Sequence, residues 1–264
     1  MDYSSYDYLD IKVADRVATV TIKRPDYFSY EAHHEVEEIW TDLAADHDVN
    51  AIILTGVGDI FLNPKGMGTE RKPKAGRRNH GRHQTSNGRR IVENLLDVEQ
   101  PIIAAINGDA FSLGATLALM CDVTVASDTA RIADTHVKMA VVAGDGGAVI
   151  WPLLIGPNRA KEFLMRGNTI TGADAARIGL VNYAVPADQV IAKARELAQE
   201  LADGPTWAIR WSKLAVNKWL KHQANLIMDA GLAYEAMTIK AADHEEALRA
   251  ASERRKPDFV RAKN

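Results

Sequence analysis

Residues 101–127 read PIIAAINGDAFSLGATLALMCDVTVAS, and this stretch decides the fold class. The apolar run at its start predicts a strand covered on both faces, which ends at the Asn-Gly pair 107–108. Residues 112–121 predict a helix, and DVTVAS at 122–127 predicts another buried strand. Strand and helix therefore alternate, which indicates a layered α/β core.

The alternation continues toward the N-terminus. Residues 8–25 predict two short strands, rich in β-branched residues and stopped by Pro25. The next segment, 29–46, has the apolar spacing of an amphipathic helix with Ser29 as its candidate cap. A buried strand is predicted at 49–58 and a helix at 89–99. Beyond residue 147 the pattern is mostly helical, so the C-terminal third is expected to be a set of helices.

Composition excludes several classes of protein. The 264 residues carry a net charge of −3, which provides no overall field to recruit nucleic acid or a membrane. A single cysteine, Cys121, rules out an intramolecular disulfide and fits a reducing compartment. The N-terminus lacks the features of a secretory signal, and no apolar run has the length of a membrane helix. We therefore expect a cytoplasmic protein with neither a nucleic-acid nor a membrane partner.

A biased segment at residues 65–90 contains nine Lys or Arg residues and one acid, Glu70. It is either a solvated loop or a patch for a phosphate-bearing ligand, because guanidinium and ammonium groups suit phosphate oxygens. It contains no aromatic residue to stack on a base, which argues against nucleic acid. His80 and His83 have a metal-ligand spacing but no matching ligands, so no metal site is predicted.

The stretch ADTHVKMAVVAGDGG at residues 133–147 places His136 nine residues before Asp145, among glycines. One interpretation is two satisfied polar groups at a loop. The other is a general base and the carboxylate that orients it, since a bond to one ring nitrogen fixes the tautomer and leaves the other nitrogen to take a proton. The residues alone leave both interpretations open.

Three segments carry a resemblance to a family: residues 101–127, the run GDGGAVIWPLLIGPNRAKEFLMRGNTITGADAARIGLVNYAVP at 144–186, and EEALRAASERRKPDF at 245–259. Together they resemble the crotonase (enoyl-CoA hydratase/isomerase) superfamily over essentially the whole chain. The resemblance implies an α/β fold, the crotonase (ClpP-like) spiral of ββα units with a helical C-terminal region. It implies a spiral core at 1–200, a helical trimerisation region at 201–264, and a homotrimer or a dimer of trimers.

The same resemblance implies an oxyanion hole of two backbone N–H groups, which match Asn63 and Leu113 here. Donors fixed before the reaction are each worth roughly 3 kcal/mol in a transition state. Typical enoyl-CoA hydratases also carry two glutamates that handle water. This chain has Thr116 and His136 at those positions. A threonine hydroxyl cannot serve as acid or base at neutral pH, so the resemblance does not imply ordinary hydration.

Within the superfamily, residues 136–167 are most similar to 6-oxocamphor hydrolase and related β-diketone hydrolases, which cleave a carbon–carbon bond between two ketones. That resemblance implies a water-activating dyad of His136 and Asp145, with His33 and Glu235 near the substrate. The branch carries a further histidine where this chain has Gly114. The predicted substrate pocket contains Phe28, Trp151, Gly114 and Thr116, although Trp151 could equally be a core residue.

Three hypotheses on function remain. The first is a hydrolase of β-diketones that uses the dyad and needs no cofactor. The second is an enzyme acting on a CoA thioester, either an enoyl-CoA hydratase/isomerase or a β-ketoacyl-CoA hydrolase; ERRKPDF at 253–259 and the basic segment would then hold the nucleotide. The third is a catalytically idle crotonase-fold protein that binds or assembles.

Overall fold

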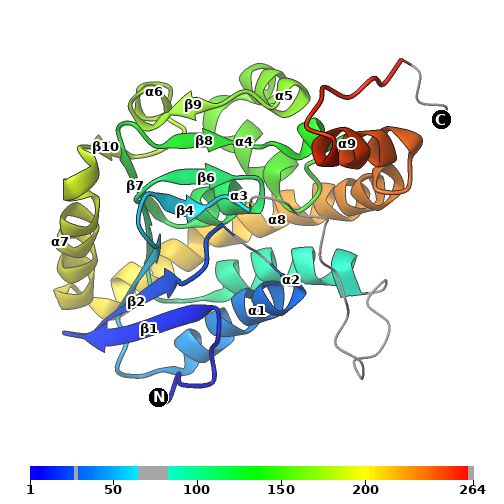
Figure 1. Cartoon of the computed structure of the whole chain (residues 1–264). Helices are drawn as coiled ribbons and strands as arrows, with labels where there is room; N and C mark the ends of the chain where they lie inside the picture. The colour runs from blue at the N-terminus through cyan, green and yellow to red at the C-terminus, as the bar shows by residue number, and fades with distance from the viewer. Residues whose placement is uncertain (27–28, 65–82, 261–264) are drawn as a thin grey trace.

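The computed structural model describes residues 1–26, 29–64 and 83–260, and its strands form two sheets within these residues (Figure 1). The larger sheet has the order β1-β2-β3-β5-β7-β10, and the smaller has the order β4-β6-β8-β9. The larger sheet consists of β1 (Leu9–Ala14), β2 (Val17–Ile22), β3 (Ala51–Gly56), β5 (Ile102–Ile106), β7 (Val123–Ser127) and β10 (Tyr183–Val185). The smaller consists of β4 (Ile60–Leu62), β6 (Asp109–Phe111), β8 (Arg131–Ala133) and β9 (Ile170–Thr171).

The helices follow the strand pairs, so the chain climbs through repeated ββα units. The first three units end in α1 (Tyr30–Ala45), α2 (His83–Asp97) and α3 (Leu113–Met120). After β8 come the short 3-10 helix η2 (His136–Met139), then α4 (Gly147–Ile155), α5 (Pro157–Arg166) and α6 (Gly172–Arg177). The C-terminal part contains η3 (Ala187–Gln189), α7 (Val190–Asp203), α8 (Thr206–Thr238) and α9 (Ala242–Ser252).

In most units one strand joins each sheet, and its neighbours in that sheet are parallel. β3, β5 and β7 pair in parallel in the larger sheet, and β4, β6 and β8 do so in the smaller. The first unit differs, because β1 and β2 form an antiparallel hairpin whose turn residues Asp15 and Arg16 have positive φ. The predicted spiral of ββα units is confirmed.

The core explains why the long strands were predictable. β5 is buried at every position, and β2, β3 and β7 supply residues to the same two clusters of buried side chains. Ser29 caps α1 by accepting a hydrogen bond from the Ala32 N–H, as predicted. One boundary was wrong: α2 begins at His83 and not at residue 89, so residues 83–90 of the basic segment are helical.

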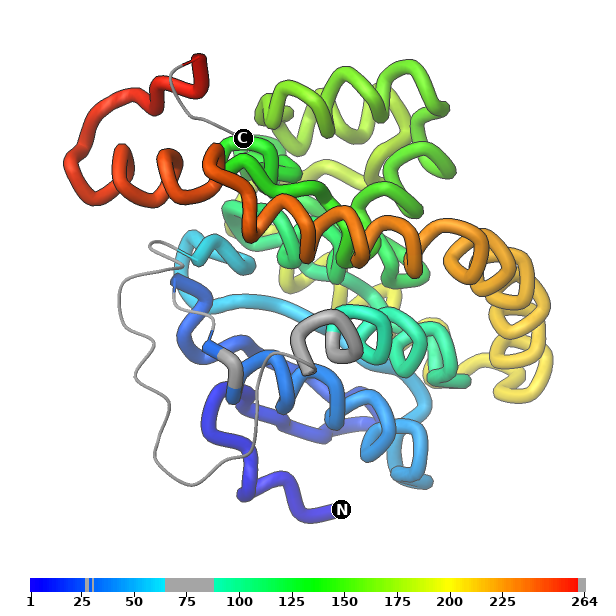
Figure 2. The backbone as a smooth tube through the Cα atoms, turned by 90° about the vertical axis from the view of Figure 1, so that its right-hand side faces the viewer, coloured from blue at the N-terminus to red at the C-terminus, as the bar shows by residue number. Residues whose placement is uncertain are grey.

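α8 is the longest helix in the described part of the chain. Its 33 residues span about 50 Å, and it crosses one face of the molecule from yellow to orange (Figure 2). It packs against α2 and α4, so the helical region after residue 201 lies directly on the core. None of the helices in the described ranges combines the length and apolarity needed to cross a membrane.

Candidate active site

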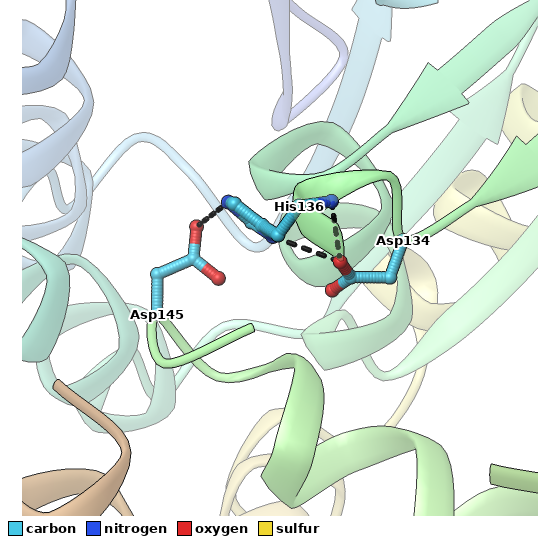
Figure 3. A group of neighbouring side chains, drawn as sticks. All are labelled: Asp134, His136 and Asp145. Carbon is cyan, nitrogen blue, oxygen red and sulfur yellow. Dashed lines mark hydrogen bonds and ion pairs between the residues drawn. The ribbon is translucent and has the colours of Figure 1, made fainter. Parts of the chain in front are cut away.

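The candidate site forms where β8 ends. Asp134 follows the last residue of that strand, and His136 begins η2 two residues later. The chain then loops to Asp145, directly before Gly146, which caps the N-terminus of α4. Figure 3 shows the imidazole of His136 between the carboxylates of Asp134 and Asp145. The side chain of Asp134 is only 1% exposed, and those of His136 and Asp145 are 11% and 12% exposed.

Asp134 holds the histidine. Nδ1 of His136 lies 2.8 Å from Oδ1 of Asp134, and the backbone N–H of His136 donates to the same oxygen at 3.2 Å. An ionised carboxylate only accepts, so Nδ1 carries the proton and Nε2 faces away. Nε2 lies 3.5 Å from Oδ2 of Asp145. The orienting role predicted for Asp145 therefore belongs to Asp134, a residue that the sequence interpretation missed.

Glu235 completes a group of three acids around one base. It lies on α8, and its carboxyl group interacts electrostatically with Asp145 and Asp134. Burial, followed by the charge of Asp145, raises the pKa of Glu235 to about 7. Burial also raises the pKa of Asp145. For His136, burial alone would lower the pKa, but Asp145 and Asp134 outweigh it and raise this pKa to about 10.

Each glycine around Asp145 occupies a position where a larger residue would clash or would strain the backbone. A Cβ on Gly144 would lie 2.4 Å from the backbone oxygen of Gly231 on α8, and one on Gly147 would lie 2.3 Å from Oδ2 of Asp134. Gly146 has φ +118°, in the region that favours glycine, which turns the chain from Asp145 into α4. This loop thus brings its backbone against both α8 and Asp134.

The C-terminal helices hold the same loop at further points. Nδ1 of His244, on α9, lies 2.7 Å from the backbone oxygen of Met139, the last residue of η2. The backbone N–H of Val142 donates to Oγ1 of Thr238 at 3.2 Å. The segment between His136 and Asp145 is therefore fixed by residues that lie far away in the sequence.

Four buried carboxylate oxygens have no hydrogen-bond partner in the described part of the chain, and three of them belong to this site: Oδ2 of Asp134, Oδ1 of Asp145 and Oε2 of Glu235. Buried polar atoms are normally paired, so open acceptors at one place indicate that the site receives water or a ligand. Oγ1 of the fully buried Thr116 is also open among the described contacts.

Asp134, His136 and Asp145 also offer ligand atoms within 4.8 Å of one another, which by donor type would suit a divalent cation. Each ring nitrogen of His136, however, already faces one carboxylate. A cation would have to displace one of these contacts, so the arrangement suits proton transfer better. The absence of a metal from the reaction stays a prediction.

The comparisons with known proteins bear on this geometry. A family model described as enoyl-CoA hydratase/isomerase matches residues 12–262. A probable enoyl-CoA hydratase of Mycobacterium bovis is 31% identical, covering 97% of this chain and 99% of the relative. The chain belongs to the enoyl-CoA hydratase/isomerase family.

Solved structures agree with this crotonase assignment. An enoyl-CoA hydratase/isomerase from Mycobacterium paratuberculosis has a TM-score of 0.86 at 27% identity, covering 94% of this chain and 99% of that one. A β-diketone hydrolase from the cyanobacterium Anabaena sp. PCC 7120, bound to (S)-3-oxocyclohexyl acetic acid, has a TM-score of 0.79 at 28% identity, covering 89% and 95%. The predicted crotonase fold is therefore confirmed.

The predicted oxyanion donors of this crotonase differ in their surroundings. Leu113 is the first residue of α3, where a backbone N–H has no acceptor within the helix. The backbone N–H of Asn63, by contrast, donates to the oxygen of Pro25 at 2.8 Å. That hydrogen bond argues against Asn63 as a donor to substrate, and we correct the prediction accordingly.

The predicted pocket residues Trp151, Gly114 and Thr116 lie in different surroundings. Trp151 is fully buried and packs on Phe163 with ring centroids 5.3 Å apart, so it is a core residue rather than a pocket wall. Gly114 leaves no room for a side chain, since a Cβ there would lie 2.4 Å from the backbone oxygen of Leu62. Thr116 lies beside the Asp145 loop, with its methyl group 2.7 Å from where a Cβ on Gly146 would be.

Two further predictions remain untested. His33 is half-buried on α1. Its predicted role near the substrate stays a prediction. Phe28 lies outside the described residues, as do residues 65–82 of the basic segment.

The described end of the basic segment and the C-terminal tail use some of their cations internally. Arg90 contacts Glu37 at 3.1 Å, and Arg89 contacts Glu93 at 2.7 Å. In the tail, the guanidinium of Arg255 donates to both carboxylate oxygens of Glu246. These arginines are therefore paired within the chain rather than left open for a phosphate.

Proposed function

We propose that this crotonase hydrolyses a carbon–carbon bond of a β-diketone in a retro-Claisen reaction. The observation that carries the proposal is the held histidine: Asp134 binds Nδ1 of His136, and Nε2 faces Asp145. His136 stands at one of the two positions where the hydratase resemblance implies a glutamate. The β-diketone hydrolase among the similar structures supports the same reading.

The reaction needs a proton acceptor for water. Nε2 of His136 and the carboxylate of Asp145 lie 3.5 Å apart. Because the pKa of His136 is raised to about 10, the pair already holds one proton near neutral pH, and its carboxylate takes a second proton from water. The water oxygen then bonds to one ketone carbon. The bond between that carbon and the carbon between the two carbonyls breaks, and its electron pair passes to the second carbonyl as an enolate.

The products follow from this bond cleavage. The attacked ketone becomes a carboxylic acid, and the enolate becomes a ketone when it gains a proton on carbon. Backbone donors such as the Leu113 N–H would stabilise the enolate oxygen. Glu235, with its pKa raised to about 7 by burial and by Asp145, holds a proton near neutral pH and is our candidate donor. No cofactor is required.

Turnover of a small panel tests the proposal. Cyclic β-diketones, crotonyl-CoA and a β-ketoacyl-CoA are offered to wild type and to His136→Ala, with His47→Ala, at an exposed histidine, as the matched control. We expect diketone cleavage in wild type and in the control, and its loss in His136→Ala. Wild-type cleavage that survives the loss of His136 would contradict the mechanism.

A CoA thioester is the second candidate, and the curated relatives favour it. Several of them are named enoyl-CoA hydratases, including a short-chain-enoyl-CoA hydratase of Clostridium acetobutylicum that is 29% identical. Turnover of the CoA esters alone in the same panel would establish this alternative. No turnover of any substrate in the panel would favour the third candidate, a catalytically idle binding or assembly protein.

We also propose that the chain assembles into a homotrimer or a dimer of trimers. The support is the surface of α8, where Trp207, Trp211 and Trp219 are each more than half exposed. Trp207 and Trp211 contact each other with centroids 5.4 Å apart, but water still reaches both. Light scattering on the purified protein in solution measures the molar mass of the assembly, and the mass of a monomer would contradict the proposal.

A further inference from the structure

Ser112, directly before α3, has an unusual backbone. Its φ is 50° and its ψ is −120°, a conformation that side-chain-bearing residues rarely adopt. Glycine would adopt it without strain. A strained residue beside a reacting site is a reason to ask what its side chain contributes.

The hydroxyl of Ser112 does not perform the usual task of a serine before a helix. Such a serine normally accepts hydrogen bonds from the first-turn amides, but α3 has no side-chain cap. The Oγ of Ser112 instead lies 2.8 Å from Oγ1 of Thr135. The first-turn amides, including that of Leu113, are thereby left for another acceptor.

Backbone and side chain of Ser112 bind the same segment. Its N–H donates to the oxygen of Ala133 at 2.9 Å, while its hydroxyl contacts Thr135. Asp134 lies between these two partners and holds the ring of His136. The residue that starts α3 is therefore tied to the segment that carries the histidine and its orienting acid.

We propose that Ser112 and Thr135 are positioning residues, whose hydroxyl pair sets the Leu113 N–H and the His136 ring at a fixed separation. The inference rests on the proposed function, in which the oxyanion donor and the proton acceptor serve one substrate. A shift of either element relative to the other would misplace the carbonyl between them.

A double-mutant cycle of Ser112→Gly and Thr135→Val tests the pair. Ser112→Gly removes the hydroxyl, so kcat should fall about tenfold, which corresponds to the free energy of one hydrogen bond. Glycine also relieves the strain of the positive φ, so Tm should not fall. Thr135→Val has a similar effect on kcat, and the double variant is no worse than either single one. Thr135→Ser, which keeps the hydroxyl, restores most of kcat.

A second hydroxyl pair supplies the matched control. Oγ of Ser127 lies 3.1 Å from Oγ1 of Thr129 in the turn after β7, at the opposite end of β8 from Asp134. Thr129→Val should change stability without changing kcat. Wild-type kcat in Ser112→Gly, or additive losses of about a hundredfold in the double variant, would overturn the proposal.

A readout without substrate separates this inference from the proposed function. Ring ¹⁵N resonances of His136 report its tautomer and its order in the free protein. We expect one set of signals in wild type and in Thr129→Val, and broadened or doubled signals in Ser112→Gly and Thr135→Val. If the ring signals change as expected but no diketone is cleaved, the positioning role stands and the substrate proposal fails. Unchanged ring signals overturn the positioning role.

Discussion

Gly231 on α8 lies directly against Gly144 in the loop that carries Asp145. A Cβ on Gly144 would come within 2.4 Å of the Gly231 oxygen and within 2.8 Å of Oε2 of Glu235. Glu235 follows Gly231 by one helical turn and therefore shares its face of α8. The glycine contact thus sets the acid of α8 beside the dyad loop.

Gly144→Ala should consequently separate Glu235 from the dyad. The added methyl group must displace backbone on one side, because the Gly231 oxygen cannot rotate away as a flexible side chain can. We expect kcat to fall about 10²-fold and Tm to fall as well. Gly179→Ala is a useful comparison, since nothing lies within 4 Å of its Cβ position and only its positive φ is strained. Equal kcat losses in the two variants would contradict this explanation.

Asp134→Asn tests the orienting acid. The amide keeps the shape but can present an N–H to Nδ1 of His136, which favours the wrong tautomer. We expect kcat to fall about 10²–10⁴-fold with a smaller change in KM. Asp122→Asn removes a carboxylate that pairs with Lys213 at 2.7 Å, away from the histidine. That control should lose stability while keeping the pH profile of wild type.

Substitutions of Trp151 test whether its side chain belongs to the core or lines the substrate pocket. Because its side chain is fully buried on Phe163, Trp151→Ala should lower the free energy of unfolding by about 3–5 kcal/mol. Trp151→Phe should cost much less and leave KM unchanged. A large rise in KM for Trp151→Phe, measured where the variant is fully folded, would return this residue to the pocket.

The long buried strands were predictable because continuous apolar runs mark them. β5, for example, is buried at all five positions. The apolar pattern alone did not predict the smaller sheet, because β4, β6 and β8 have three residues each, too few for a period to emerge. Their pairing is a tertiary property of the spiral.

The site was only partly predictable for a similar reason. His136 and Asp145 stand out as polar residues in an apolar stretch, and the structure brings them together. Asp134 was overlooked although it lies two residues before His136, because only the short turn into η2 returns the ring to that carboxylate. A D-x-H spacing at the end of a strand was the available signal. Asn63 failed because its N–H is taken by Pro25, which precedes it by 38 positions.

Glu235→Gln should change the pH dependence of activity. If protonated Glu235 returns the proton to carbon, wild-type activity is present below its pKa of about 7 and is lost as the pH rises through that value. Glutamine does not titrate, so the variant should have a lower rate without this alkaline limb. Rates of wild type and Glu235→Gln between pH 5 and pH 9, a range of about two pH units on either side, measure the effect. An unchanged limb in the variant would assign it to another group.

The same raised pKa predicts that Glu235→Gln, which lowers the rate, raises the stability of the protein at alkaline pH. Folding favours the protonated form of Glu235, because burial and the charge of Asp145 oppose its ionisation. Its favourable contribution is complete below the unfolded value near 4.5 and is lost as the pH rises through the folded value near 7. Glu235→Gln stays neutral throughout, so its Tm should exceed that of wild type above pH 7, and the difference should shrink toward acid pH. Thermal melts at both ends of this range measure it, and a variant less stable than wild type at alkaline pH would show that Glu235 is stabilising as an anion.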